Sequence, residues 1–557
     1  MSHRRDHDEP RGKKRPLVLL AAAGDSPSDD PGTDWASLLG DLSRPPLRER
    51  PGAVEWRVHD KTHLEFAIDY PLREAPDTLV WEAYFFVPES FRLQQDTYDK
   101  KAIYDDLWSY IRYAVPEIPF HELARGGAGS ALGAVEAALS AARGKPDASD
   151  EATRAMRELR LFACHLRAGG VRAMRDAERA VSDPGRDEAE VRSSVSGFGA
   201  AVVAVSQAAK RALEPSACQA LSEDTRTAAR WVDEDVSLVL ESLSASLAVA
   251  VSEAAKRAPT LTPLAEQLAA TSVVEARHRR GAGYDSVAGK DASPRQIEHL
   301  EFRRHILKRF TSSVLWLSLE IRDAAGWAIH TLYAVAAATA MGLALVAMIH
   351  SSSHDENSLR YALVIVAAYV LRDRVKASLQ KIMTKVVSRR FPDRNWRVWD
   401  RGAGHAIGRV RERAGFVPFR ALPAGALAAR RLTRVHPLEE AARPERVLWH
   451  QKKVRLEART GPFSVLTEIF RLDLHSWLDH TDDARRRIVF ADAETSEVCA
   501  VTAPRVYNVN VVYRLAAEGV DAPFERLRVV VSRKGIERIE AIEGPAKPGA
   551  RVEAEPS

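Results

Sequence analysis

The chain has 557 residues, of which 45% are hydrophobic and 28% are charged, and its formal net charge is +5. At ~100–200 residues per domain, this length favours several domains rather than a single core. The composition is ordinary for a folded soluble protein and excludes a polytopic membrane protein, and the near balance of charge gives no indication of a nucleic-acid partner.

The amino-terminal residues 1–51 predict a disordered leader. Asp, Ser, Pro and Gly are frequent between Gly24 and Pro51. Basic residues followed by the apolar run Leu17–Ala23 imitate a secretory signal, but the run is at the short end of the usual ~7–15 residues, and acidic and proline residues precede it. A cleaved signal is the less favoured interpretation.

Residues 52–122 predict a small amino-terminal α/β module. Apolar residues alternate over 64–70, and a second run rich in β-formers covers 78–91, so two strands are expected. An apolar stripe at helical spacing over 103–114 predicts a helix that stops at Pro116.

Residues 128–258 predict an Ala-rich helical bundle, because Ala, Glu and Arg dominate and proline is rare. One amphipathic helix is marked by apolar residues at steps of three and four, namely Val232, Val236, Val239, Leu243 and Leu247. Charged residues in this region are expected to solvate the outer face. Residues 294–323 then predict a membrane-proximal amphipathic helix that carries a basic cluster.

Residues 324–373 predict a two-helix transmembrane hairpin. From Ala324 to Ser353 there is no Asp, Glu, Lys or Arg, and this stretch exceeds the roughly 20 residues that cross about 30 Å of hydrocarbon. The second run, Leu359–Leu371, provides only about 20 Å of helix, so Arg360 and Arg372 would have to extend toward the headgroups. The alternatives are one span with a re-entrant or interfacial second helix, and two central helices of a soluble core.

Basic residues flank the hairpin on both sides, whereas the connecting loop contains Asp355 and Glu356. The flanking basic residues are Arg303, Arg304, Lys308, Arg309, Arg372, Arg374 and Lys376. Their distribution predicts that both termini are cytoplasmic. The Arg- and Ala-rich composition is typical of a GC-rich bacterial genome, so the expected location of the hairpin is the bacterial inner membrane. Three widely spaced cysteines, with no close pair, agree with a reducing compartment.

Small residues recur at every fourth position of the first apolar run, at Ala334, Ala338 and Gly342. This spacing predicts a smooth face on which Ala367 and Ala368 of the second helix pack closely in the membrane.

The chain after the hairpin predicts a basic helix over 374–390, a carboxy-terminal α+β domain over 391–545 and a disordered tail over 546–557. Within this domain, 464–480 is expected to be a helix. Alternating residues over 505–515 and 525–542 predict antiparallel strands with a turn at Lys534.

No motif predicts catalysis, a cofactor or a metal site. The glycine-rich stretch 126–135 lacks the Lys-Ser/Thr of a P-loop, so Ser130 is expected to be a helix cap. His475, Asp479 and His480 could approach one helix face, but no further metal ligand can be identified. Whether the protein is an enzyme stays open, with a non-enzyme favoured.

Six segments together resemble a family of uncharacterised bacterial membrane proteins with two transmembrane helices and large cytoplasmic flanks: "YFFVPESF", "YDKKAIYDDLWSYIRYAVPEIPF", "FRRHILKRFTSSVLWL", "YVLRDRVKASL", "FRLDLHSWLDH" and "RVYNVNVVYRL". The resemblance does not include the Ala-rich region 128–258. It implies an architecture and a location but no activity or catalytic residue.

The combined prediction is an α+β multidomain membrane protein that acts as a membrane-anchored cytoplasmic scaffold or regulatory protein. Its expected partners are the lipid bilayer and other proteins or further copies of itself, assembled through the Ala-rich helices, and no nucleic acid. The alternatives are a membrane-tethered enzyme, with a site between the two cytoplasmic domains, and an oligomeric pore-forming effector.

Overall fold

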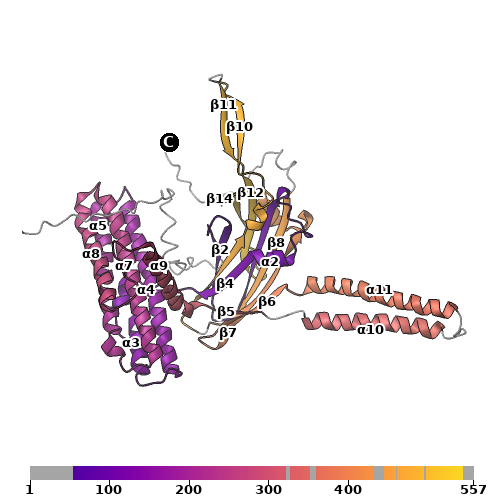
Figure 1. The fold of residues 1–557 in the computed structure, drawn as a ribbon, viewed down its shortest axis with the longest axis horizontal. Coiled ribbons are helices and arrows are strands. Elements are labelled where there is room, and N and C mark those ends of the chain that lie inside the picture. The colour runs from indigo at the N-terminus through magenta and orange to yellow at the C-terminus, as the bar shows by residue number, and fades with distance from the viewer. Residues whose placement is uncertain are drawn as a thin grey trace, which may run out of the picture. The chain divides into compact units, whose positions relative to one another are not determined.

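The computed structural model describes residues 54–321, 326–351, 359–431, 445–459, 461–494 and 497–542. The predicted leader and tail lie outside these residues, as do the loop residues Asp355 and Glu356. The described chain is a mixed α+β protein with antiparallel sheets and a helical bundle, which confirms this part of the predicted fold class (Figure 1).

A four-stranded antiparallel sheet combines strands from the beginning and the end of the described chain. Its strands are, in spatial order, β1 (Val54–Val58), β2 (His63–Pro71), β9 (Val465–Asp473) and β4 (Leu107–Tyr113). β2 and β9 pair along their whole length, with Phe66 opposite Phe470. The segments 52–122 and 391–545, predicted as separate domains, therefore interleave their strands in one structure.

The larger sheet has eight antiparallel strands. In spatial order they are β14 (Gly535–Ile542), β13 (Glu525–Ser532), β12 (Tyr507–Ala517), β3 (Asp77–Pro88), β8 (Glu445–Leu456), β7 (His405–Val417), β6 (Arg394–Asp400) and β5 (Ser318–Ile321). β3 comes from the amino-terminal segment, yet it lies between β12 and β8. The antiparallel strands predicted near the carboxyl end are confirmed, with the turn between β13 and β14 at Arg533 and Lys534.

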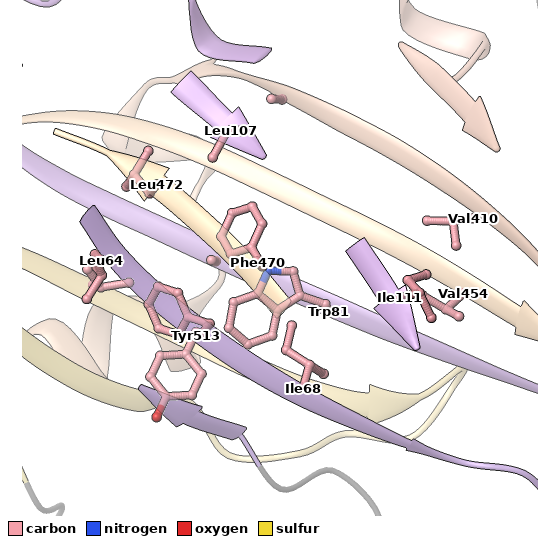
Figure 2. Close-up of a cluster of buried hydrophobic side chains, with 14 of the residues drawn as sticks. Leu64, Ile68, Trp81, Leu107, Ile111, Val410, Val454, Phe470, Leu472 and Tyr513 are labelled. Carbon is pink, nitrogen blue, oxygen red and sulfur yellow. The ribbon is translucent and has the colours of Figure 1, made fainter. Parts of the chain in front are cut away.

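The two sheets enclose one apolar core, shown in Figure 2. Trp81 of β3 is 0% exposed, and its ring centroid lies 5.7 Å from that of Phe66 and 5.3 Å from that of Tyr513. Burial of each such side chain stabilises the fold by about 1.5–3 kcal/mol. The alternation of apolar residues along β2 supplies this core from one sheet, and that along β12 from the other.

Two segments that the sequence predicts as helices are largely strands. The stretch predicted as a helix over 103–114 is a short helix, α2 (Lys100–Asp106), followed by β4. The helix predicted over 464–480 is β9, followed by the four-residue helix α14 (His475–Leu478). These two predictions are wrong for a common reason, because β4 and β9 pair with each other across a long sequence separation.

Long helices form the predicted bundle (Figure 1). They are α3 (Ala131–Ala142), α4 (Asp150–Ser182), α5 (Glu188–Ala212), the short α6 (Pro215–Cys218), α7 (Glu223–Ala255), α8 (Thr262–Gly281) and α9 (Pro294–Ser312). The apolar residues predicted to face inward from α7 are all buried. The bundle extends beyond the predicted 128–258, and the helix predicted over 294–323 ends at Ser312, with β5 after it.

Helix α4 and the residues after α9 join the bundle to the β core. Cys164 and Ala168 of α4 are buried in the same apolar cluster as Leu315 and Leu317. The Cys164 thiol donates to the backbone carbonyl of Thr311 at 3.4 Å. Burial raises the pKa of this thiol to about 12, so the cysteine packs as an unreactive apolar group.

Two helices, α10 (Gly326–Ser351) and α11 (Leu359–Arg390), form a hairpin inserted between strands of the larger sheet. They pack side by side (Figure 1). The strands before and after them, β5 and β6, pair with each other, with Leu319 opposite Val398. The predicted second apolar run and the predicted basic helix 374–390 are one continuous helix, α11.

Two smaller elements complete the described chain. β10 (Arg485–Ala491) and β11 (Val498–Pro504) form a two-stranded sheet of their own. Helix α12 (Ala424–Arg430) buries Ala426 and Ala429 in a second apolar cluster with Phe86 and Val512 of the larger sheet.

Candidate functional site

A network of buried ionisable groups lies between the two sheets. Glu412 of β7 and Lys452 of β8 are directly opposite in the larger sheet, and Glu468 of β9 approaches from the smaller one. The Lys452 ammonium contacts the Glu468 carboxylate and lies 3.4 Å from Glu412 Oε1. The side chains of Lys452 and Glu468 are each 1% exposed. Two carboxyl groups therefore share one ammonium group in the apolar core.

His450 extends this network along β8. Its Nε2 lies 2.9 Å from Glu412 Oε1, and its ring stacks on Phe470 with centroids 5.0 Å apart. Burial lowers the pKa of His450, an effect that the Glu412 carboxylate only partly offsets. The ring is therefore neutral at pH 7 and donates its Nε2–H to Glu412. Among the described residues, its Nδ1 has no hydrogen-bond partner.

The charges of the network stabilise one another. Burial alone would raise the pKa of Glu412, but the Lys452 ammonium and the His450 hydrogen bond outweigh it and hold this pKa at about 2. Burial would likewise lower the pKa of Lys452, but the Glu468 and Glu412 carboxylates raise it instead. Both groups are ionised at neutral pH, in the form that pairs best.

Tyr70 of β2 closes the network on the side of the smaller sheet. Its hydroxyl donates to Glu468 Oε2 at 2.7 Å, and burial together with that carboxylate raises its pKa. The network thus brings together residues of the amino- and carboxy-terminal segments, as the enzyme alternative requires. Its members are enclosed, with His450 and Tyr70 both 0% exposed, so a substrate does not reach them. The Lys452–Glu468 ion pair links the two sheets.

A second set of buried charges holds the bundle together. The acidic run Asp233–Asp235 of α7 is buried, and each of its three carboxylates contacts a basic side chain of a different helix. The partners are His278 of α8 at 2.8 Å, Arg303 of α9 at 2.7 Å and Arg167 of α4 at 2.6 Å. The expectation that charges here only solvate the outer face is wrong for this run, because apolar residues surround it on both sides in the sequence.

The basic residues that flank the hairpin divide into residues that face the bundle and residues that face outward. Arg303 pairs with the buried Glu234, and Arg304 donates to the Ser242 hydroxyl, so these two arginines hold α9 on α7. Lys308 is half-buried, and Arg309 is exposed. The side of α9 that carries Arg303 and Arg304 is therefore occupied by the bundle.

On α11 the flanking basic residues lie on the outward side of the helix. Arg374 and Lys376 are exposed, whereas the Arg372 guanidinium lies over the Tyr369 ring at 4.0 Å and pairs with Asp373 at 3.2 Å. The Arg372 guanidinium thus lies at the end of the second apolar run, where the sequence predicts a contact with the lipid headgroups.

The packing face of α10 differs from the predicted one. Ala336 and Ala340 are 0% exposed, whereas the predicted Ala334, Ala338 and Gly342 are exposed. The four-residue spacing is retained, but the buried stripe lies two residues further along the helix. The prediction fails because an Ala-rich helix offers several small-residue stripes, and only the partner helix selects one of them.

The remaining sequence candidates have local roles. The Ser130 hydroxyl accepts from the Gly133 N–H at 3.0 Å, which confirms it as the cap of α3. His475 begins the short helix α14, and Asp479 follows its end. Within the described ranges there is no group of three or more His, Cys, Asp and Glu side chains that could hold a metal ion.

One helix of the described chain is long and apolar enough to cross a membrane by length and composition, and it is α7. Its apolar window is 50% buried, and the helix carries the acidic run Asp233–Asp235, so its observed place is the middle of the bundle. The apolar stretch found within α10, His330–Val346, is shorter. Membrane association is thus weakly indicated, and the crossing of a bilayer by α10 and α11 stays a prediction.

Comparison with known proteins adds no relative. No protein-family model, no curated protein and no solved structure matches the chain.

Proposed function

We propose that the protein is a membrane-anchored scaffold, in which α10 and α11 insert into a bilayer and the folded parts bind protein partners on one side of it. The observation that carries this proposal is the outward orientation of large apolar side chains on both helices. Val346 is 66% exposed, and Leu363 and Val366 are each 60% exposed. By contrast, Leu240 and Leu243 of the bundle helix α7 are 0% exposed.

The cost of leaving these side chains in water supports a lipid environment. Exposed apolar surface is unfavourable by roughly 25 cal/mol per Å², and soluble proteins rarely expose contiguous apolar patches of more than a few hundred Å². The outward residues of the hairpin occur on both helices, and they include Met341, Leu343, Leu345, Ile349, Tyr369 and Val370. Lipid chains would cover such a surface without any specific partner.

The connections of the hairpin support a topology with both folded flanks on the same side. Because β5 and β6 pair with each other, the hairpin leaves and re-enters the sheet at neighbouring strands. Helix α10 has 26 residues, or about 39 Å, against about 30 Å of hydrocarbon. The apolar part of α11 is shorter, and the exposed Arg374, Lys376 and Lys381 that follow it suit the headgroup layer.

The enclosed network around Lys452 favours a binding role over an enzymatic one. Its ionisable groups converge as they would in an active site, but they face each other across the two sheets and are buried. We therefore infer that these ionisable groups stabilise the fold.

Cysteine accessibility tests the topology. In a Cys499→Ser background, where the remaining Cys164 and Cys218 are buried, single cysteines would replace Ser351, Lys381 and Val520 in turn. We expect a membrane-impermeant maleimide to label only Ser351→Cys on intact cells, and all three variants after permeabilisation. Labelling of Val520→Cys on intact cells would refute the shared side, and protection of Ser351→Cys would show that the hairpin does not cross.

Charge insertion tests the anchor itself. Leu363→Asp with Val366→Asp places two carboxylates on the outward face of α11, each costing ~2.5–3.5 kcal/mol at the centre of a membrane helix. We expect this variant to move to the alkaline-carbonate supernatant. The control Val520→Asp, at a residue 59% exposed in the β part, should stay in the membrane pellet. Equal extraction of the two variants would remove the basis of the proposal.

A further inference from the structure

The β10–β11 hairpin is an exposed surface that the proposed anchor does not use. Every residue of β10 is exposed, and the hairpin forms a sheet of its own (Figure 1). Its base is held by the Arg505 N–H, which donates to the Ala484 carbonyl at 2.8 Å, and by an ion pair of Arg505 with Asp482 at 2.6 Å. An isolated two-stranded hairpin is marginally stable in water, so a contact with another strand would stabilise the outer half of β10 and β11.

The outer half of this hairpin is apolar on both faces. Cross-strand neighbours share a face, and the apolar pairs are Ile488 with Val501, Phe490 with Cys499, Val489 with Ala500 and Ala491 with Val498. Val498 is 75% exposed, and Val489 is 60% exposed. Exposed β-strand edges with this composition pair readily with another strand.

The charges of the hairpin identify the partner. Arg485–Arg487 lie at its base and form no ion pair among the described residues, whereas the tip carries the carboxylates of Asp492, Glu494 and Glu497. Two such hairpins aligned base to tip bring opposite charges together, and a parallel alignment would bring like charges together. The acidic tip also opposes burial in lipid.

We propose that this hairpin binds a second copy of the chain, with β10 paired antiparallel to β10 about a two-fold axis at Val489. In that register Arg486 lies opposite the second copy's Asp492, and Ile488 lies opposite the second copy's Phe490. Alternation along each strand puts these facing residues on the same side of the sheet. The product is a four-stranded sheet with closed two-fold symmetry, which exceeds the three strands needed for independent stability.

Disulfide trapping tests the register. Across the two-fold axis, the Cα atoms of Val489 would be about 4.5–5.5 Å apart, within the ~4.4–6.8 Å that a disulfide spans. In the Cys499→Ser background of the full chain in detergent, Val489→Cys should form a covalent dimer on mild oxidation. The control Val520→Cys, which is 59% exposed against 60% for Val489, should stay monomeric. Equal dimer yields from both variants would overturn the proposal.

Charge reversal tests the partner independently. Arg486→Asp and Asp492→Arg should each lower the dimer yield by about tenfold, since the altered pair occurs twice about the axis. The double variant should restore it. The Asp492 carboxylate also accepts from the Glu494 N–H at 2.9 Å, but loss of that turn contact would not be rescued by Arg486→Asp. A dimer yield of the double variant no higher than that of the single variants would overturn the proposal. Protection of the Val489→Cys thiol from maleimide by liposomes, without formation of a dimer, would overturn it as well.

Discussion

Replacement of Lys452 by Met should destabilise the β structure strongly, because it removes the ammonium that Glu412 and Glu468 share. The pKa of Glu412 is held at about 2 against an ordinary 4.5, which corresponds to about 3 kcal/mol at neutral pH. Removing one partner of a buried ion pair typically costs about 3–5 kcal/mol. We therefore expect Lys452→Met to lower the free energy of unfolding by about 3 kcal/mol.

The neighbouring lysine provides a matched control. Lys453 is on the same strand and also pairs with a carboxylate, that of Glu518, but the two side chains are 40% and 52% exposed. Surface pairs of this kind contribute about 0–1 kcal/mol, so Lys453→Met should be nearly silent. Urea titration of the solubilised full chain, followed by tryptophan fluorescence, measures both variants, since Trp81 is 0% exposed in the same core.

Unfolding of the two methionine variants at the same urea concentration would refute a stabilising role of the Lys452 ammonium. A second variant separates loss of charge from loss of packing. Adding Glu468→Met to Lys452→Met removes one carboxyl group left without its ammonium, and it should recover part of the lost stability. Further destabilisation by the double variant would show that packing, rather than charge pairing, dominates at this site.

Three further predictions follow from the described contacts. The stability of the β structure should fall as the pH is lowered from about 5 to about 2, because the pKa of Glu412 is lower in the folded state than in the unfolded state, so that unfolding takes up a proton. Glu412→Gln should flatten this part of the plot of urea midpoint against pH. Gly408→Ala should lower the free energy of unfolding by about 1–3 kcal/mol, since its Cβ would lie 2.4 Å from a backbone oxygen of β8. Gly415, on the same strand, has open space around the position of a Cβ, so Gly415→Ala should leave the urea midpoint unchanged. Arg167→Met should leave Asp235 buried without its cation and lower the thermal midpoint of the bundle by circular dichroism, an effect that Arg167→Lys should reduce.

The sequence predicts elements best where local periodicity and tertiary burial agree. The face of α7 from Val232 to Leu247 is buried as predicted, because both the three-four spacing and the bundle demand it. The strands around Phe66 and Val511 are likewise recognisable from alternation alone.

Failures occur where the spacing fits two structures. Leu107 and Ile111 are four residues apart, which suits one face of a helix and equally one face of a strand. Their strand, β4, forms because Ile111 lies opposite Glu468 of β9, far along the chain. No local pattern in either segment contains this pairing.

The buried charges are not predictable from the sequence, for a different reason. Glu412, Lys452 and Glu468 are ordinary polar residues in their own segments, and only the contact between sheets makes them a network. Alternation along β8 places Lys452 on the buried face of the strand. A lysine at an inward position is the one signal in the sequence that indicates a buried ion pair.

The separation of β2 from β9 has a consequence for biosynthesis. The bond between Tyr70 and Glu468 joins residues 398 positions apart, and at ~5–20 residues per second the ribosome needs about 20–80 s to supply the second after the first. For that interval β2 lacks β9, one of its two neighbouring strands. The helical hairpin emerges before β6 to β9, so its delivery to a bilayer would precede closure of both sheets. Shielding of the amino-terminal strands from aggregation during that interval would therefore raise the yield of folded protein.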